Sequence, residues 1–224
     1  LNTDSQKLEF FAQDRWYEMA TDSPNLGDTN NSNEQVGGAR GIFAGGFAPS
    51  ATDRIDYITI NHLGDATDFG NLTVSRAAAA AAGSRTRGLL FAGTPNTNTI
   101  DYWTISQEGD ALDFGDISDA GHWTQAVSSQ TRAITAGGNS IGNIIQFVTI
   151  ASTGNAQDFG DLTYHSPAVA ANSSIQSPTR GIFAGGTPST TNAIDFVTIA
   201  TKGNSQEFGD YTTHTAREAR GSNA

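Results

Sequence analysis

Acidic side chains spaced three residues apart recur along the chain and are its first candidates for chemistry. The recurring triplets are Asp65/Asp68/Asn71, Asp110/Asp113/Asp116, Asn155/Asp158/Asp161 and Asn204/Glu207/Asp210. Carboxylate and amide oxygens of this kind could bind calcium, but the spacing lacks the alternate-residue pattern and glycine of a calcium loop. We therefore favour a structural role, in which these oxygens accept backbone N–H groups in tight turns or pair with arginines. The sequence predicts no metal site.

Arginines recur in phase with these triplets. The four positions are Arg40, Arg87, Arg132 and Arg180. A functional interpretation is a ring of cations around a channel that takes an anionic ligand. The structural alternative is an ion pair with a recurring aspartate (Asp56, Asp101 or Asp195), which the planar guanidinium favours because it can pair with both carboxylate oxygens. We favour the ion pair.

Two places depart from the recurring pattern and carry aromatic and imidazole side chains where an equivalent segment has alanines. They are His122 with Trp123, and Tyr164 with His165. Exposed aromatic rings stack on sugar faces while neighbouring polar groups bind hydroxyls, so these four residues form the candidate ligand-binding set. As alternatives, Trp123 fills a gap left by smaller neighbours or contacts another subunit.

Catalytic signatures are scarce in this chain. The histidines at positions 62, 122, 165 and 214 are scattered, and no Ser/His/Asp motif surrounds them. The absence of cysteine excludes disulfides, thiolate zinc sites, iron–sulfur clusters and a cysteine nucleophile. We expect a non-enzymatic protein without a cofactor. A glycan-cleaving protein that uses paired carboxylates is the remaining enzymatic alternative.

The charge balance argues against two classes of partner. The chain has 224 residues, 12 basic and 23 acidic side chains and a formal net charge of −11. Nucleic acid and anionic membrane surfaces both need clustered Lys and Arg. The longest uninterrupted alanine run, Ala77–Ala82, is far shorter than a membrane span. We predict neither nucleic-acid binding nor membrane insertion.

Three phased motifs make up a repeat of about 45 residues that occurs four times. The first motif is a glycine-bounded apolar run, as in Arg40–Gly46, typical of an inner strand covered on both faces. The second is rich in β-branched and aromatic residues, as in Ile55–Ile60, and the third is Asp-Phe-Gly-Asp or a close variant. Small residues close the unit, clearest at Ala77–Gly83, and we predict a strand there too.

This organisation resembles the Kelch family of β-propellers over residues 25–224, since a glycine pair follows a buried strand and precedes an aromatic strand. The family's tryptophan is replaced by phenylalanine, at Phe69, Phe114, Phe159 and Phe208. The resemblance implies an all-β fold with a Kelch-like propeller of four to five blades. We expect the ring to be closed by strands from both termini.

Residues 1–24 lie outside the repeat and predict an attachment segment with a short β-hairpin. Lys7–Phe11 and Arg15–Glu18 supply its strands, with a turn at Gln13 and Asp14. The string Asn2-Thr3, Lys7–Phe11 and Trp16 resembles a hairpin of bacteriophage structural proteins and fibres. The repeats also look like those of marine phage virion proteins, where the pattern Gly-Gly, Ile-Asp-Tyr-Val-Thr-Ile and Asp-Phe-Gly-Asp recurs.

These resemblances imply a virion structural protein in a fibre, a tail or the capsid surface. Its partners would be other virion proteins and copies of itself, with a trimer implied by the fibre resemblance, and a host-surface glycan is a further expected partner. Variable loops are expected on one rim of the propeller, where loops carry recognition. These loops are 47–54, 94–99, 139–143 and 187–193. The alternative is a secreted or cell-surface lectin-like propeller.

Overall fold

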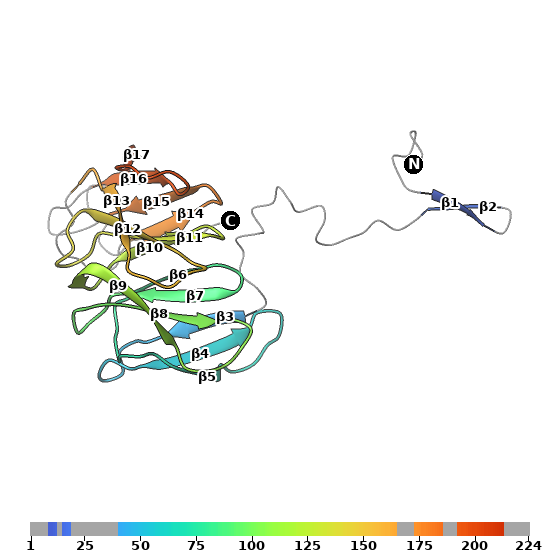
Figure 1. The fold of residues 1–224 in the computed structure, drawn as a ribbon, viewed down its shortest axis with the longest axis horizontal. Helices are drawn as coiled ribbons and strands as arrows, with labels where there is room; N and C mark the ends of the chain where they lie inside the picture. Colours follow the sequence, from blue (N-terminus) through green and yellow to red (C-terminus); the bar gives the residue numbers. More distant parts are fainter. Residues whose placement is uncertain (1–8, 13–14, 19–39, 165–172, 186–191, 213–224) are drawn as a thin grey trace. The chain divides into compact units, whose positions relative to one another are not determined.

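The computed structural model describes residues 9–12, 15–18, 40–164, 173–185 and 192–212, with the backbone alone for 9–12, 15–18 and 173. The chain divides into two units, Leu1–Glu34 and Gln35–Ala224. The sequence-based division after residue 24 stays a prediction, because residues 19–39 lie outside the described ranges. Every regular element in the described part is a β-strand (Figure 1).

The first unit contains a two-stranded antiparallel hairpin, formed by β1 (Glu9–Ala12) and β2 (Arg15–Glu18). Phe11 pairs with Trp16 in its register. The hairpin lies where the sequence predicts one, and the predicted turn residues lie outside the described ranges.

The second unit contains four antiparallel sheets, in which neighbouring strands follow each other in chain order. Sheet 1 consists of β3 (Arg40–Ala44), β4 (Arg54–Thr59) and β5 (Thr67–Asn71). Sheet 2 consists of β6 (Ala80–Gly83), β7 (Arg87–Phe91), β8 (Thr97–Thr104) and β9 (Leu112–Gly121). Sheet 3 consists of β10 (Gln125–Ser128), β11 (Arg132–Ala136), β12 (Ile144–Thr149) and β13 (Gln157–Asp161). Sheet 4 consists of β14 (Ser173–Gln176), β15 (Arg180–Ala184), β16 (Ala193–Thr198) and β17 (Gln206–Asp210).

Each sheet corresponds to one set of repeat motifs. The glycine-bounded motif forms β3, β7, β11 and β15, the aromatic motif forms the next strand, and the Asp-Phe-Gly-Asp motif forms the third. The predicted small-residue strand is present as β6, which starts inside the alanine run. It pairs with β7, as β10 pairs with β11 and β14 with β15.

The glycine of the third motif has a steric reason. Gly70 and Gly115 have φ angles of 149° and 142°, which side-chain-bearing residues rarely adopt. A Cβ at either position would also collide with the backbone of the next sheet, at Gly109 and Gly154 respectively. The third motif therefore lets one sheet approach its neighbour closely.

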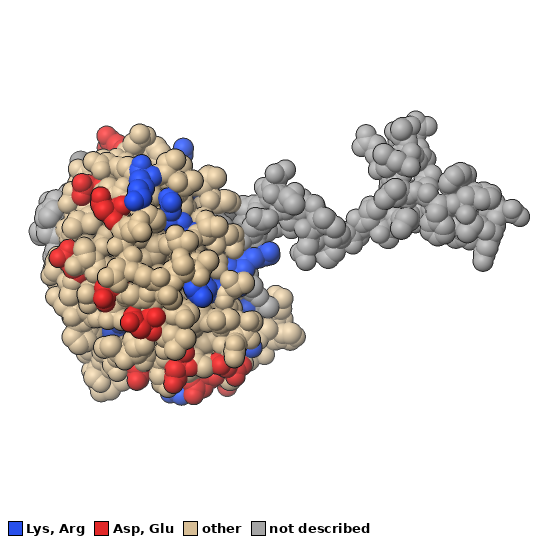
Figure 2. Space-filling model, viewed as in Figure 1, with Lys and Arg blue, Asp and Glu red and all other residues tan. Residues whose placement is uncertain are grey.

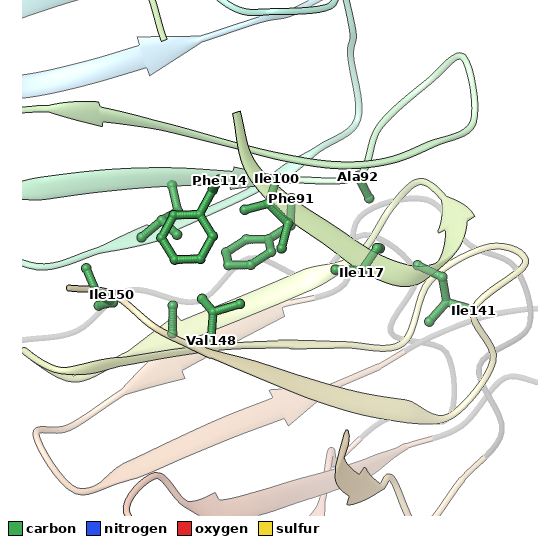
Figure 3. Close-up of a cluster of buried hydrophobic side chains, with 10 residues drawn as sticks. Phe91, Ala92, Ile100, Phe114, Ile117, Ile141, Val148 and Ile150 are labelled. Carbon is green, nitrogen blue, oxygen red and sulfur yellow. The ribbon is translucent and has the colours of Figure 1, made fainter. Parts of the chain in front are cut away.

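Three hydrophobic cores fill the spaces between consecutive sheets. In the core between sheets 2 and 3, Phe91, Ile100 and Phe114 face Val148 and Ile150 (Figure 3). The motif phenylalanines meet an aromatic ring of their own sheet edge-on, a favoured geometry for aromatic pairs. These pairs are Tyr57–Phe69, Tyr102–Phe114, Phe147–Phe159 and Phe196–Phe208.

The first strands of sheets 2, 3 and 4 lie next to one another, with β6 beside β10 and β10 beside β14. Together with Arg40 and Ile42 of β3 they line one cavity of about 490 Å³. In the described residues, β3 has no partner equivalent to β6, β10 or β14. The segments expected to close a ring, before Arg40 and after Thr212, lie outside the described ranges, so the number of blades stays a prediction.

Strand β3 of sheet 1 differs from the inner strand expected there, which would be covered on both faces. Phe43 of β3 is 60% exposed, whereas the equivalent Leu90 and Phe183 are buried. The difference arises because no sheet in the described part packs against that face of sheet 1.

Candidate functional site

The repeat arginines connect one sheet to the next. Each guanidinium lies 4.4–4.5 Å from the centre of an aromatic ring on the second strand of its own sheet, within cation–π range. The Nη1 atoms of Arg40, Arg87 and Arg132 also donate to the backbone oxygens of an isoleucine in the following sheet. These bonds are Arg40–Ile105 (3.0 Å), Arg87–Ile150 (2.7 Å) and Arg132–Ile199 (2.7 Å).

The predicted pairing of these arginines with the recurring aspartates is corrected by this geometry. Asp101 lies 3.0 Å from Arg76, and both side chains are fully buried. Asp195 accepts hydrogen bonds from Thr163 and Ser205. Asp101 and Asp195 accept hydrogen bonds from the loop that leaves the preceding sheet. The repeat arginines donate hydrogen bonds to the following sheet instead. The repeat ion pair that the described residues do show is Arg40 with Glu108, at 3.5 Å.

The first members of three of the four acidic triplets accept backbone N–H groups, as favoured from sequence. Asp110 Oδ1 accepts the Asn71 N–H at 2.9 Å, and Asn155 Oδ1 accepts the Asp116 N–H at 3.1 Å. The Asp161 N–H donates to Asn204 at the same distance of 3.1 Å. Among the described residues, no three His, Asp or Glu side chains are grouped to hold a metal ion.

The departure at His122 brings two loops of neighbouring sheets together. Its Nδ1 lies 2.5 Å from the Asn96 Oδ1 in the loop before β8. Its Nε2 lies 3.2 Å from the Asn139 Nδ2 in the loop after β11. The loops 94–99 and 139–143, expected on a common rim, thus meet at one imidazole. Neither asparagine belongs to the predicted set, and the signal that could have indicated them is their place in the variable loops.

This pair of contacts suits a neutral imidazole that carries its proton on Nδ1. That proton is donated to the Asn96 oxygen, and the unprotonated Nε2 accepts from the Asn139 amide. Burial lowers the pKa of His122 below its ordinary value of 6.5, because desolvation disfavours the charged form. Burial and hydrogen bonding therefore favour the same protonation state.

Trp123 presents an indole to solvent beside this imidazole. Its ring meets the His122 ring edge-on, with centroids 4.4 Å apart, and the residue is 37% exposed. Its φ of +58° is unusual for a bulky residue, but the equivalent Ala78 has φ of +52°. The left-handed backbone therefore belongs to the repeat, and the departure at this point is confined to the side chain.

Tyr164, another residue of the predicted ligand-binding set, is not part of this surface. Tyr164 packs against the core between sheets 3 and 4. Burial, with the nearby Asp195 carboxylate, raises the pKa of Tyr164. His165 lies outside the described ranges. The structure thus brings His122 and its neighbour Trp123 close to Asn96 and Asn139, whereas Tyr164 packs against a different part of the unit.

The chemistry of this cluster suits a binding surface. It offers an exposed aromatic surface flanked by amide groups, which is suited to a neutral polar ligand. In the described residues, no helix has the length and apolarity to span a membrane. Comparison with protein-family models gave no match, and comparison with curated proteins gave none either.

Proposed function

We propose that the chain is a non-enzymatic bacteriophage virion structural protein of a fibre, a tail or the capsid surface. Its four sheets act as blades of a Kelch-like propeller that displays variable loops for assembly or host-surface attachment. One observation carries the proposal. The contacts between sheets repeat from boundary to boundary, while the loops that meet at His122 differ in sequence and carry exposed side chains.

A rigid frame supports display because loops held on it keep one geometry. At each of the three boundaries an arginine combines a ring contact with a carbonyl bond. Contacts of these two kinds each contribute about 1 kcal/mol. Many copies on a particle would then convert weak loop contacts into useful avidity.

The surface chemistry also suits the exterior of a particle. Figure 2 shows acidic side chains spread over the face in view, with several near the lower edge beside sheet 1. With a net charge of −11, such a surface resists association with nucleic acid and favours solubility.

The experiment is to locate the protein in intact virus. An antibody raised against residues 40–212 is applied with gold labels to purified particles of the virus that encodes the chain. We expect label at a fixed site on every particle. Label that matches pre-immune serum, with the protein present only in the lysate, contradicts the proposal.

The lectin-like alternative rests on Trp123 and its neighbouring amides. A glycan array is probed with the intact protein, with W123A and with F47A, because Phe47 is an exposed aromatic of another loop. Saturable binding that W123A loses and F47A retains favours the lectin. An array without bound glycan removes it.

A further inference from the structure

We propose that the outer face of sheet 4 binds the outer face of sheet 1 of a second copy of this chain, through the contacts that join neighbouring sheets within one chain. The sheet 4 face is defined by Arg180, Phe208 and Asp210. The sheet 1 face is defined by Phe43, Ile60 and residues 64–66. This interface goes beyond the proposed function: it requires that the four sheets of one chain form an open arc instead of a closed ring, and it does not depend on a virion location.

The apolar side chains of the two faces occupy repeat positions that are buried at the boundaries between the other sheets. Phe69, Phe114 and Phe159 are each no more than 3% exposed under the following sheet, whereas Phe208 is 53% exposed. On the opposite side, Ile150 and Ile199 are buried against the preceding sheet, whereas Ile60 is 59% exposed. Sheets 1 and 4 therefore each present one half of a core that the repeat builds three times.

The polar groups of the two faces are complementary in the same way. Within the chain, the N–H groups of Gly109, Gly154 and Gly203 donate to the backbone oxygens of the preceding motif phenylalanines at 2.7–2.8 Å. The equivalent groups are the Gly64 N–H on sheet 1 and the Phe208 oxygen on sheet 4. Among the described residues these two groups do not bond to each other.

A second backbone bond follows the same rule. The N–H groups of Ala111, Ala156 and Ser205 donate at 2.8 Å to residues 71, 116 and 161 of the preceding sheet. The equivalent donor is Ala66 and the equivalent acceptor is Asp210.

Side chains add two further matches. Arg180 lies over the Phe196 ring like the other repeat arginines, but no carbonyl among the described residues accepts from it. Its expected acceptor is the Ile60 oxygen, equivalent to the oxygens of Ile105, Ile150 and Ile199. The Asp65 carboxylate is equivalent to Asp110, which accepts the Asn71 N–H, and would take the Asp210 N–H. This contact brings two carboxylates together, whereas the boundaries within the chain each place a carboxylate beside an amide.

A second copy is the occupant that these observations favour. Both faces are exposed in the same molecule. Sheet 1 and sheet 4, which carry these faces, lie at opposite ends of the second unit (Figure 1). The faces differ from each other, so one contact between two copies leaves two faces open. A two-fold pair, in which each copy gives its sheet 4 face to the other's sheet 1 face, covers all four.

The first test is the mass of the full chain in solution. We expect twice the 23.4 kDa of one chain. F208D and I60D each place a carboxylate in the interface and should weaken association by about 30-fold or more, as at a binding hot spot. F47D is the matched control, because Phe47 is 73% exposed but belongs to neither face.

Mixing the two variants identifies which face meets which. F208D keeps an intact sheet 1 face and I60D an intact sheet 4 face, so an equimolar mixture should recover a two-chain species that neither forms alone. Recovery also shows that both variants are folded. A wild-type monomer, an assembly insensitive to both substitutions, or a mixture without recovery each overturns the proposal.

Crosslinking distinguishes binding of a second copy from a contact between sheet 4 and sheet 1 of the same chain. The chain has no cysteine, so A66C/D210C can be joined by a short bis-maleimide, with N71C/A111C as the internal control. We expect A66C/D210C to give a doubled mass on a denaturing gel, and the control to stay at one chain. A compact single-chain product of A66C/D210C shows self-closure and overturns the second copy as occupant.

Discussion

Asp56 of sheet 1 and Asp101 of sheet 2 occupy the same position of the repeat and have opposite environments. Asp101 is fully buried, 3.0 Å from the Arg76 guanidinium, and accepts from the side chain and the N–H of Thr73. Asp56 has a side chain that is 35% exposed and lies 3.2 Å from Arg54, itself exposed. The comparison teaches that the repeat fixes the strand position, while the preceding sheet decides whether the carboxylate becomes a buried acceptor.

The buried pair in sheet 2 is held on several sides. Arg76 also donates to the backbone oxygens of Thr99 and Leu90. Burial lowers the pKa of Arg76, and the Asp101 charge opposes that shift. Removing either charge leaves the other unpaired in the interior.

The largest expected effect comes from breaking this pair. D101A should lower the free energy of unfolding by about 3–5 kcal/mol, because Arg76 loses its counter-ion inside the protein. D56A, at the equivalent exposed position, should change it by less than about 1 kcal/mol. Urea unfolding of both variants measures the difference. Equal losses would contradict the environments described for the two carboxylates.

The next effect concerns glycines at equivalent positions of the same two sheets. A Cβ at Gly88 would overlap the ring of the buried Trp103, whereas a Cβ at Gly41 would lie 3.3 Å from Ile58 Cγ1 and 3.7 Å from Ile60 Cγ1. G88A should therefore destabilise the protein by about 1–3 kcal/mol, and G41A by much less. Thermal unfolding of the two variants provides the measurement, and a G41A variant as unstable as G88A would contradict it.

A smaller effect distinguishes arginines with and without a following sheet. R132K loses the bond to the Ile199 oxygen and part of the ring contact, and should cost about 1 kcal/mol. R180K loses only part of its ring contact and should cost less. Both are made in the F208D background, so that only contacts within the chain contribute. A greater loss for R180K there would argue against the boundary described for sheets 3 and 4.

The smallest effect is a pH dependence at the loop cluster. Because the folded-state pKa of His122 lies below 6.5, the unfolded chain takes up its proton first as the pH falls. The contribution of the neutral imidazole is complete above pH 6.5 and is lost as the pH falls through the folded-state pKa. Unfolding between about pH 7 and about pH 5 should therefore show a steeper loss for wild type than for H122Q. Identical slopes would place the pKa of His122 at its unfolded value.

The sequence predicted the elements that depend on local pattern. The four phased sheets and the small-residue strand follow from β-branched, aromatic and glycine positions that repeat. The pairing of Arg76 with Asp101 was missed because Arg76 occurs outside the repeat phase and its partner lies on another sheet. The packing of Tyr164 against the core between sheets 3 and 4 could not be predicted either, since nothing in the neighbouring residues signals it.

The shared left-handed backbone at Ala78 and Trp123 has a consequence for variation. A methyl group and an indole are carried there on the same chain path, and the Trp123 N–H donates to the Ala78 oxygen at 2.8 Å, which ties one site to the other. The same left-handed conformation is held at both sites whichever side chain is present. Side-chain identity at these two sites can therefore change the exposed chemistry while the frame beneath stays as it is.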